Sequence, residues 1–191
     1  SQDYYGTIFA VAVSRWEART IWTGSDDGMV HVTRDGGASW SNVTPPDLPK
    51  FSRVSSIEPS PHDPARAYLA IERYKMQDPA PYIFKTEDYG LSWVMITAGI
   101  APGHFVRAVR EDPVRPGLLF AGTEHGPYVS FDDGSDWQEL RLNLPDLQVS
   151  DLVVKDDDVV IATFGRSLFI LDDISPLREL RGDLLQRSFH L

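Results

Sequence analysis

Two polar loops of this chain carry residue types that could transfer protons or bind a cation. The loop GTEHG places Glu124 beside His125, and a carboxylate next to an imidazole could act as an acid–base pair near neutral pH. The loop GSDDG places Asp26 beside Asp27, whose oxygens suit a hard cation. Glu124 and His125 are therefore the candidate catalytic residues. A solvated polar turn flanked by glycines is the alternative interpretation, and it requires no chemistry.

The elements that must position these loops are marked by an eight-residue pattern, which we call the box. Its copies are TRDGGASW (33–40), TEDYGLSW (86–93) and SFDDGSDW (130–137). Each copy has a hydroxyl residue first, an Asp two residues later, then a Gly and a final Trp. Self-similarity with a period of roughly 50 residues is typical of repeat architectures. The box therefore predicts that the chain is built from repeated units.

The fixed residues of the box favour a structural role. The Asp carboxylates can accept hydrogen bonds from the backbone of a tight turn, the Gly residues supply positive φ, and the Trp residues anchor each unit. These residues are Asp35, Gly37, Trp40, Asp88, Gly90, Trp93, Asp132, Gly134 and Trp137. Three equivalent copies cannot all be one active site, so we expect the boxes to hold turns rather than to catalyse.

The segments around the boxes read as short strands rich in Val, Ile, Tyr, Phe and Trp. Each unit has four such strands, with the box as the turn between the third and the fourth. The predicted units are 7–47, 52–98, 105–144 and 149–174, followed by a helix and tail at 175–191. The fourth unit has no box, and Ser175 before Pro176 is typical of a helix N-cap.

Four-stranded units at this spacing predict an all-β fold, a β-propeller of about four blades in one domain over residues 1–191. A plain β-sandwich is the alternative, but it does not explain the repeated box. An incomplete ring leaves two sheet faces bare. We therefore expect either self-association through these open ends or an incomplete parent domain.

The boxes resemble the Asp-box, or BNR, repeats of sialidases, sortilin-type receptors and xyloglucanases. Segments 21–40, 118–137 and 159–180 are similar to the last blades of exported bacterial BNR-repeat proteins, a sortilin-like group labelled glycosyl hydrolases. The resemblance implies the C-terminal half of a seven-bladed type of propeller and a secreted or periplasmic location. The group carries ATHGR in its last blade, where this chain has Phe164 in place of the His. No catalytic set of the sialidase or xyloglucanase type can be assigned.

Propeller geometry predicts where a ligand would bind. The loops between second and third strands lie on one rim, and the boxes lie on the opposite face. The residues that these loops bring to the rim are Asp26, Asp27, Glu72, Arg73, Glu124, His125 and Arg166, with His104 entering from an inter-blade loop. They suit a glycan or a peptide. A binding module is the leading prediction; a glycoside hydrolase that uses rim carboxylates and a pure scaffold are the alternatives.

Composition narrows the possible partners. The formal charge of −10 and the isoelectric point near 4.8 argue against nucleic acid, whose phosphates would be repelled. The chain has no cysteine, which excludes disulfides and cysteine-ligated metal. No apolar run approaches the ~20 residues of a membrane span. We expect no cofactor and no metal, and a protein or carbohydrate ligand.

Overall fold

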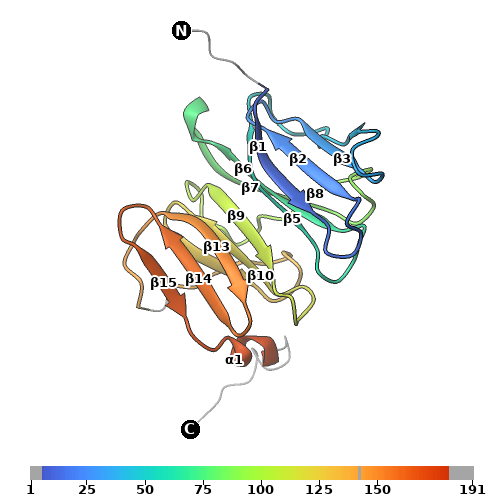
Figure 1. The fold of residues 1–191 in the computed structure, drawn as a ribbon. Helices are drawn as coiled ribbons and strands as arrows, with labels where there is room; N and C mark the ends of the chain where they lie inside the picture. Colours follow the sequence, from blue (N-terminus) through green and yellow to red (C-terminus); the bar gives the residue numbers. More distant parts are fainter. Residues whose placement is uncertain (1–5, 142, 181–191) are drawn as a thin grey trace.

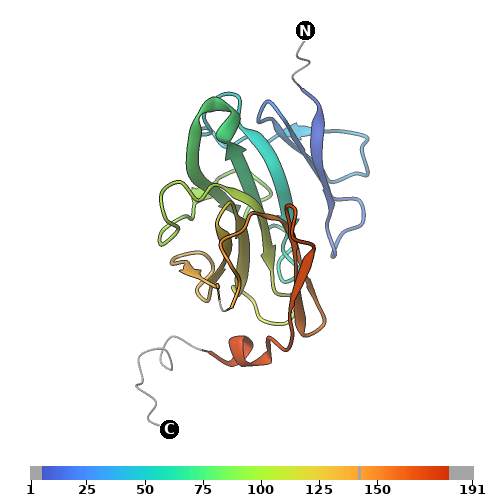
Figure 2. The ribbon, with the colours of Figure 1, turned by 90° about the vertical axis from the view of Figure 1, so that its left-hand side faces the viewer.

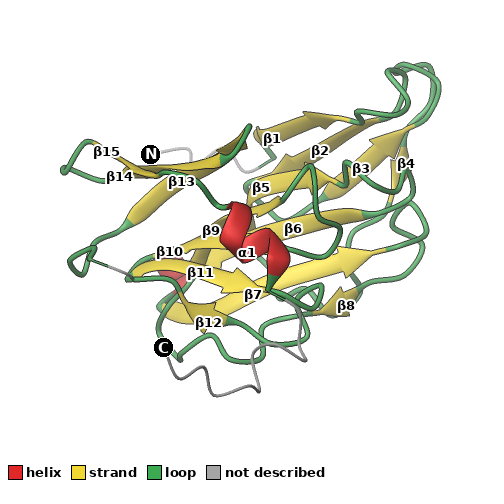
Figure 3. Cartoon of the chain, turned by 90° about the horizontal axis from the view of Figure 1, so that it is seen from below, coloured by secondary structure: helices red, strands yellow, loops and turns green. Residues whose placement is uncertain are grey.

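The structure, a computed structural model, describes residues 6–141 and 143–180. It contains four antiparallel sheets, which we call blades 1 to 4 and which follow one another along the chain. Figure 3 shows them as an arc, with blades 1 and 4 at its two ends. Blades 1, 2 and 3 have four strands each, and blade 4 has three among the described residues.

The strands of each blade are hydrogen-bonded in chain order (Figure 1). Blade 1 contains β1 (Ile8–Val13), β2 (Ile21–Ser25), β3 (Val30–Thr33) and β4 (Ser41–Asn42). Blade 2 contains β5 (Arg53–Pro59), β6 (Ala67–Arg73), β7 (Asp78–Thr86) and β8 (Val94–Met95). Blade 3 contains β9 (Val106–Glu111), β10 (Leu119–Thr123), β11 (Gly126–Ser130) and β12 (Gln138–Glu139). Blade 4 contains β13 (Val149–Lys155), β14 (Asp158–Thr163) and β15 (Leu168–Leu171).

Two short helices mark opposite ends of the blades (Figure 2). The 3-10 helix η1 (Tyr74–Met76) lies between β6 and β7, and α1 (Ser175–Glu179) follows β15. Pro176 lies in the first turn of α1, but the N-cap is Ile174 rather than the expected Ser175. Asp173 takes the local capping role instead, since its carboxylate accepts a hydrogen bond from the backbone N–H of Ser175 at 3.1 Å.

The hydrophobic core consists of three clusters, one between each pair of neighbouring blades. Each blade presents a small residue on its second strand to an aliphatic residue on the first strand of the next blade. A Cβ added at Gly24 would clash with Val54, and one added at Gly122 would clash with Val149. The glycines therefore allow the close approach of neighbouring sheets, on which the burial of apolar surface depends.

Within residues 6–141 and 143–180, blade 1 has no neighbour on its outer face. A β-bulge at the start of each first strand places Ile8, Val54, Val106 and Val149 at equivalent positions. Val54, Val106 and Val149 are 0% exposed, because each packs on the preceding blade. Ile8 is 60% exposed, and Val11 on the same face is 63% exposed. This bare face of blade 1 thus carries apolar residues at positions whose counterparts in the other blades are buried against a neighbouring blade.

Blade 4 has no neighbour on its opposite face in the part of the chain that the structure describes. Val153, Leu168 and Ile170 are exposed there, and the pairings of Val153 and Ile170 with Val160 put them on one side of the sheet. Ala162 lies on the same side, at the position that Gly24 and Gly122 occupy in blades 1 and 3. Each end of the arc is therefore an apolar sheet face without a partner among the described residues.

The boxes form the turns at the lower end of the blades. In blade 2, the Asp88 carboxylate accepts hydrogen bonds from the backbone N–H of Ser92 at 2.8 Å and from the Thr86 hydroxyl at 2.8 Å. Equivalent bonds join Asp35 to Ser39 and Asp132 to Asp136. The box glycines Gly37, Gly90 and Gly134 have φ of 95°, 86° and 84°. These conformations favour glycine, so the turn geometry explains both fixed residues.

The box tryptophans differ in burial because each one packs on the preceding blade. The indole N–H of Trp93 donates to the carbonyl of Val43 at 2.7 Å, and that of Trp137 donates to Ile96 at 2.8 Å. Trp137 is 2% exposed, whereas Trp40 is 45% exposed. Within residues 6–141 and 143–180 no blade lies against this face of blade 1, so Trp40 is exposed where Trp93 and Trp137 find a partner.

Candidate functional site

The rim at the upper end of the blades is the predicted ligand-binding region. Glu72, the last residue but one of β6, is 2% exposed. It forms ion pairs with Arg53 and with Arg107, whose Nη1 lies 3.0 Å from its carboxylate. Arg107 also reaches Glu124 at 3.4 Å. Glu72 is thus buried below the rim rather than presented on it, because two guanidinium groups cover its carboxylate. Glu124 remains half-buried beside Arg107.

The other acidic residues of the rim hold the local backbone. Asp26 accepts hydrogen bonds from the backbone N–H groups of Gly6 at 2.8 Å and Thr7 at 2.9 Å. Asp27 accepts from the hydroxyl of Ser25 within the same turn. The carboxylates of Asp26 and Asp27 are therefore engaged with different parts of the chain. No cluster of three or more potential metal ligands occurs within residues 6–141 and 143–180.

Two histidines from different loops meet on the rim. The ring centroids of His104 and His125 are 4.5 Å apart. His125 Nδ1 lies 3.0 Å from Asp146, and His104 Nδ1 lies 2.9 Å from the hydroxyl of Tyr128. Partial burial lowers the pKa of His104, and the nearby His125 lowers it further. Both effects favour the neutral form of His104, so its ring can both accept and donate a hydrogen bond.

Arginines 73 and 166 lie in different environments. Arg73 Nε donates to Asp78 at 2.7 Å, and its Nη1 donates to Ser52 at 3.1 Å. These bonds fix the base of the loop that carries η1. Arg166 is exposed in the turn between β14 and β15. Of these two predicted binding residues, Arg166 is the one with its side chain open to solvent.

Exposed apolar side chains accompany the polar ones, and they are not among the binding residues predicted from the sequence. Met29, Tyr74, Met76 and Phe164 are 38%, 40%, 44% and 75% exposed, respectively. They come from the second-to-third-strand loops of blades 1, 2 and 4, and His125 comes from the matching loop of blade 3. The ring of Tyr74 stacks on Phe105 with centroids 5.2 Å apart. The rim therefore offers apolar and aromatic contacts beside paired charges.

The side chains of this rim are better placed to bind a ligand than to transfer a proton. Glu72 is enclosed by arginines, and Glu124 is paired with Arg107. Asp26 accepts from the backbone, and Asp27 accepts from the Ser25 hydroxyl. A general acid or base needs reach to a substrate and a suitable pKa. Exposed aromatic and methionine side chains, by contrast, are typical of surfaces that bind polypeptides.

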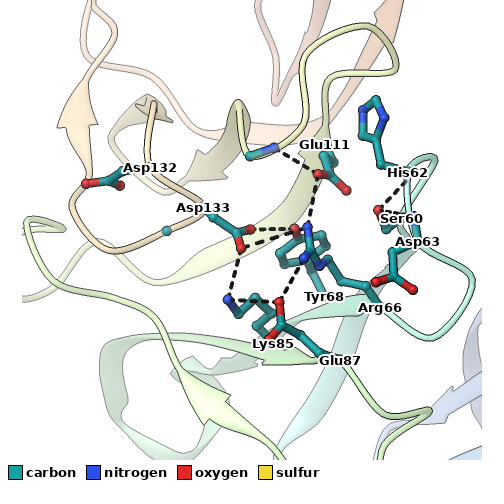
Figure 4. Close-up of polar contacts among 12 residues, drawn as sticks. Ser60, His62, Asp63, Arg66, Tyr68, Lys85, Glu87, Glu111, Asp132 and Asp133 are labelled. Atoms are coloured by element: carbon teal, nitrogen blue, oxygen red, sulfur yellow. Dashed lines mark hydrogen bonds and ion pairs between the residues drawn. The ribbon is translucent and has the colours of Figure 1, made fainter. Parts of the chain in front are cut away.

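A second polar network lies on the box face, between blades 2 and 3 (Figure 4). Asp133 accepts hydrogen bonds from the hydroxyl of Tyr68 at 2.7 Å and from Lys85 Nζ at 2.9 Å. Arg66 donates to Glu87 at 2.8 Å and lies 4.0 Å from the buried Glu111. Burial raises the pKa of Tyr68, and the carboxylates of Glu111 and Asp133 raise it further, so this phenol stays protonated as a donor.

This network joins blades 2 and 3. The feature of the boxes that bears on it is the variable residue just before the fixed Gly. Asp133 fills the variable position just before the box Gly134. The matching residue of blade 2, Tyr89, also reaches the preceding blade, where Arg34 lies 3.7 Å from its ring centroid. The variable box residue is thus an inter-blade contact. Its partners are far away in the sequence, so spacing alone could not identify them.

No described helix is long and apolar enough to cross a membrane. Comparison with families of known proteins gives no match, and neither does comparison with curated proteins. Solved structures do resemble the fold. They include "YCF48 bound to D1 peptide" (TM-score 0.65, 19% identity, covering 87% of this chain and 51% of that chain).

Two other solved structures extend the comparison. The GH74 xyloglucanase from Xanthomonas campestris has a TM-score of 0.65 at 18% identity, covering 86% of this chain and 28% of that chain. The computationally designed Ika4 protein has a TM-score of 0.62 at 11% identity, covering 90% of this chain and 94% of that chain. At these identities the likeness shows the fold, which is a β-propeller. The chain spans about half the length of the YCF48 chain, at 51%.

Proposed function

We propose that this chain is a binding module of the β-propeller class and that its ligand is a polypeptide held on the rim opposite the boxes. The observation that carries the proposal is the set of exposed apolar side chains, Met29, Tyr74, Met76 and Phe164, on the loops of the rim that also carries the two histidines. The solved YCF48 propeller bound to a peptide supports it by analogy. Candidate hydrogen-bonding residues on the same rim are Asp26, Asp27, Arg73, Glu124, His125 and Arg166, whereas the predicted Glu72 is buried below them by its two arginine partners.

A peptide is favoured over a glycan substrate for hydrolysis because of the carboxylates. Most glycosidases need two carboxyl groups that face the bond to be cleaved. Glu72 is 2% exposed and Glu124 is paired with Arg107. The xyloglucanase-like neighbour keeps glycan binding or hydrolysis as the second candidate. In that case Glu124 and His125 would be the acid–base pair, and Glu124→Gln would abolish turnover of a sugar substrate.

The direct test is selection from a displayed library of random peptides, run in parallel with a glycan array. We expect peptides to be enriched, and the double variant Tyr74→Ser/Phe164→Ser to weaken their binding by at least about tenfold, since aromatic anchors dominate such interfaces. Leu91→Ser is the matched control, because Leu91 is 86% exposed on the box face. Enrichment of glycans alone, or an equal loss in the control, would contradict the proposal.

We also propose that the chain is the C-terminal half of a larger, exported Asp-box propeller of the seven-bladed type. The bare faces of blades 1 and 4 support this, as does coverage of 51% of the YCF48 chain. When the chain is alone, the same faces favour self-association, since Ile8 and Val11 could pack over Ala162 of a second copy. The export assignment also rests on the box resemblance and predicts that the parent gene encodes a secretion signal.

Sedimentation equilibrium tests the assembly. We expect the wild-type chain to associate as its concentration rises, and Val11→Glu to remain monomeric, because a charge on an apolar interface costs several kcal/mol. Val114→Glu is the control, since Val114 is 62% exposed in the loop between β9 and β10. A wild-type chain that stays monomeric at every concentration would refute the self-association.

A further inference from the structure

A hollow of about 160 Å³ lies between blades 3 and 4. Leu140 and Leu144 line it from the end of blade 3, and Ile161, Phe169 and Leu171 line it from β14 and β15. Ile170 and the polar Asn143 complete the lining, which is otherwise apolar. Within the described residues, β15 pairs with β14 alone, so the hollow lies beside a free strand edge. Such an edge carries backbone N–H and C=O groups that can pair with another strand.

The same place in blades 2 and 3 is filled by a tryptophan. Trp137 packs in one cluster with Ile96, Ala121 and Tyr128. The sheet registers make Ala121 and Tyr128 the counterparts of Ile161 and Phe169 in blade 4. Ile96 and Leu140 are also counterparts, because each donates its backbone N–H to the third strand of its own blade. The hollow is therefore lined as the Trp137 site is lined.

Blade 2 repeats this arrangement. Trp93 packs against the cluster that contains Val43, Leu69 and Phe84, which occupy the positions of Leu140, Ile161 and Phe169. In both blades the indole N–H donates to the carbonyl of the preceding blade, at Val43 and at Ile96. The matching acceptor beside the hollow is the carbonyl of Leu140.

Blade 4 cannot fill the hollow by the usual turn. Leu171 stands where the boxes have a hydroxyl residue, and Asp173 stands where they have the fixed Asp. The chain then enters α1 at Ser175. Arg178, at the position of the box Trp, instead bonds to Asp112 at 2.6 Å. The helix leads the chain away from the edge of β15.

We propose that the free edge of β15 and this hollow bind an extended polypeptide strand that carries a tryptophan. The occupant is a strand of the type that follows the boxes of blades 2 and 3. Its Trp fills the hollow and donates its N–H to Leu140. The next two residues pair with Ile170 and Phe169, as Val94 and Met95 pair with Lys85 and Phe84. This site is separate from the rim and does not depend on the rim proposal.

The probe is a synthetic peptide with the sequence of residues 91–98, LSWVMITA, blocked at both ends. A second peptide with alanine in place of the Trp is its control. Isothermal titration measures both against the wild-type chain. We expect the first peptide to bind one-to-one, at least about tenfold more tightly than the second, because the indole is the buried anchor. Hydrogen exchange at Phe169 and Ile170 should slow when it binds, through new backbone pairing.

Two protein variants locate the site. Leu171→Lys places a charge in the hollow and should weaken binding at least about tenfold, whereas Leu168→Lys, on the opposite face of β15, should leave it within about twofold. Circular dichroism checks that each variant folds, and Leu144→Lys replaces Leu171→Lys if the latter does not. Equal affinity for both peptides, no binding, or wild-type affinity in the hollow variant overturns the proposal.

Discussion

At the residue scale, Glu58 is the ionisable group whose environment has the clearest consequence for stability. Burial raises its pKa to about 7, although Arg110 partly offsets the effect. The folded protein therefore holds a proton that the unfolded chain releases at lower pH. The stability contributed by Glu58 is present below about pH 4.5 and is lost as the pH rises through about 7.

We expect Glu58→Gln to flatten this dependence. Between about pH 5 and about pH 8, the free energy of unfolding of the wild type should fall by about 2 to 3 kcal/mol relative to the variant. Urea denaturation at both pH values measures it. His104, with its lowered pKa, makes the free energy of unfolding rise with pH in both proteins. The difference between the two proteins therefore isolates the contribution of Glu58. Parallel pH profiles would show that Glu58 keeps an ordinary pKa.

At the element scale, the burial of the box tryptophans sets the strength of each inter-blade contact. Trp137→Ala should destabilise the monomer by about 3 to 5 kcal/mol, since the indole is 2% exposed and its N–H is bonded. Trp40→Ala should cost less than about 1 kcal/mol, because Trp40 is 45% exposed. Chemical denaturation of both variants at a dilute, monomeric concentration provides the comparison. Similar losses in the two would contradict the assignment of blade 1 as an open end.

The elements were predictable from the sequence to the extent that local chemistry determines them. The hydroxyl, Asp and Gly of the box act within one turn, so their spacing indicated the turn between third and fourth strands and, through it, the propeller. The role of Trp40 depends on a neighbouring blade, which no local pattern can supply. The N-cap at Ile174 also depends on a contact outside the helix. The carboxylate of Asp173, which follows β15, accepts a hydrogen bond from the backbone N–H of Ser175.

The candidate site was less predictable because it depends on contacts between blades. The approach of His104 and His125 follows from propeller topology and could be anticipated. The burial of Glu72 could not, because Arg53 and Arg107 come from two first strands that are far apart in the sequence. The exposed Phe164 was noted as a departure from the resembling group. Its place in a ring of apolar rim residues required the structure.

At the scale of the whole molecule, the arc predicts a gradient of local stability. Among the residues that the structure describes, blades 2 and 3 are covered on both faces, whereas blades 1 and 4 are covered on one. Amide hydrogen exchange of the dilute monomer should therefore be slowest in β6 and β10 and fastest in β1 and β15, since few buried contacts oppose opening at the ends. Uniform protection across the four blades would contradict an open arc.

The proposed function depends most directly on where a polypeptide ligand binds. Backbone amide NMR shifts, followed while a library-selected peptide is added, test this directly. We expect shifts to cluster in the rim loops at 26–29, 74–77, 124–126 and 164–167, together with His104, and to spare the boxes at 33–40, 86–93 and 130–137. Shifts concentrated on the boxes or on the bare faces of blades 1 and 4 would contradict the assignment of the rim as the binding surface.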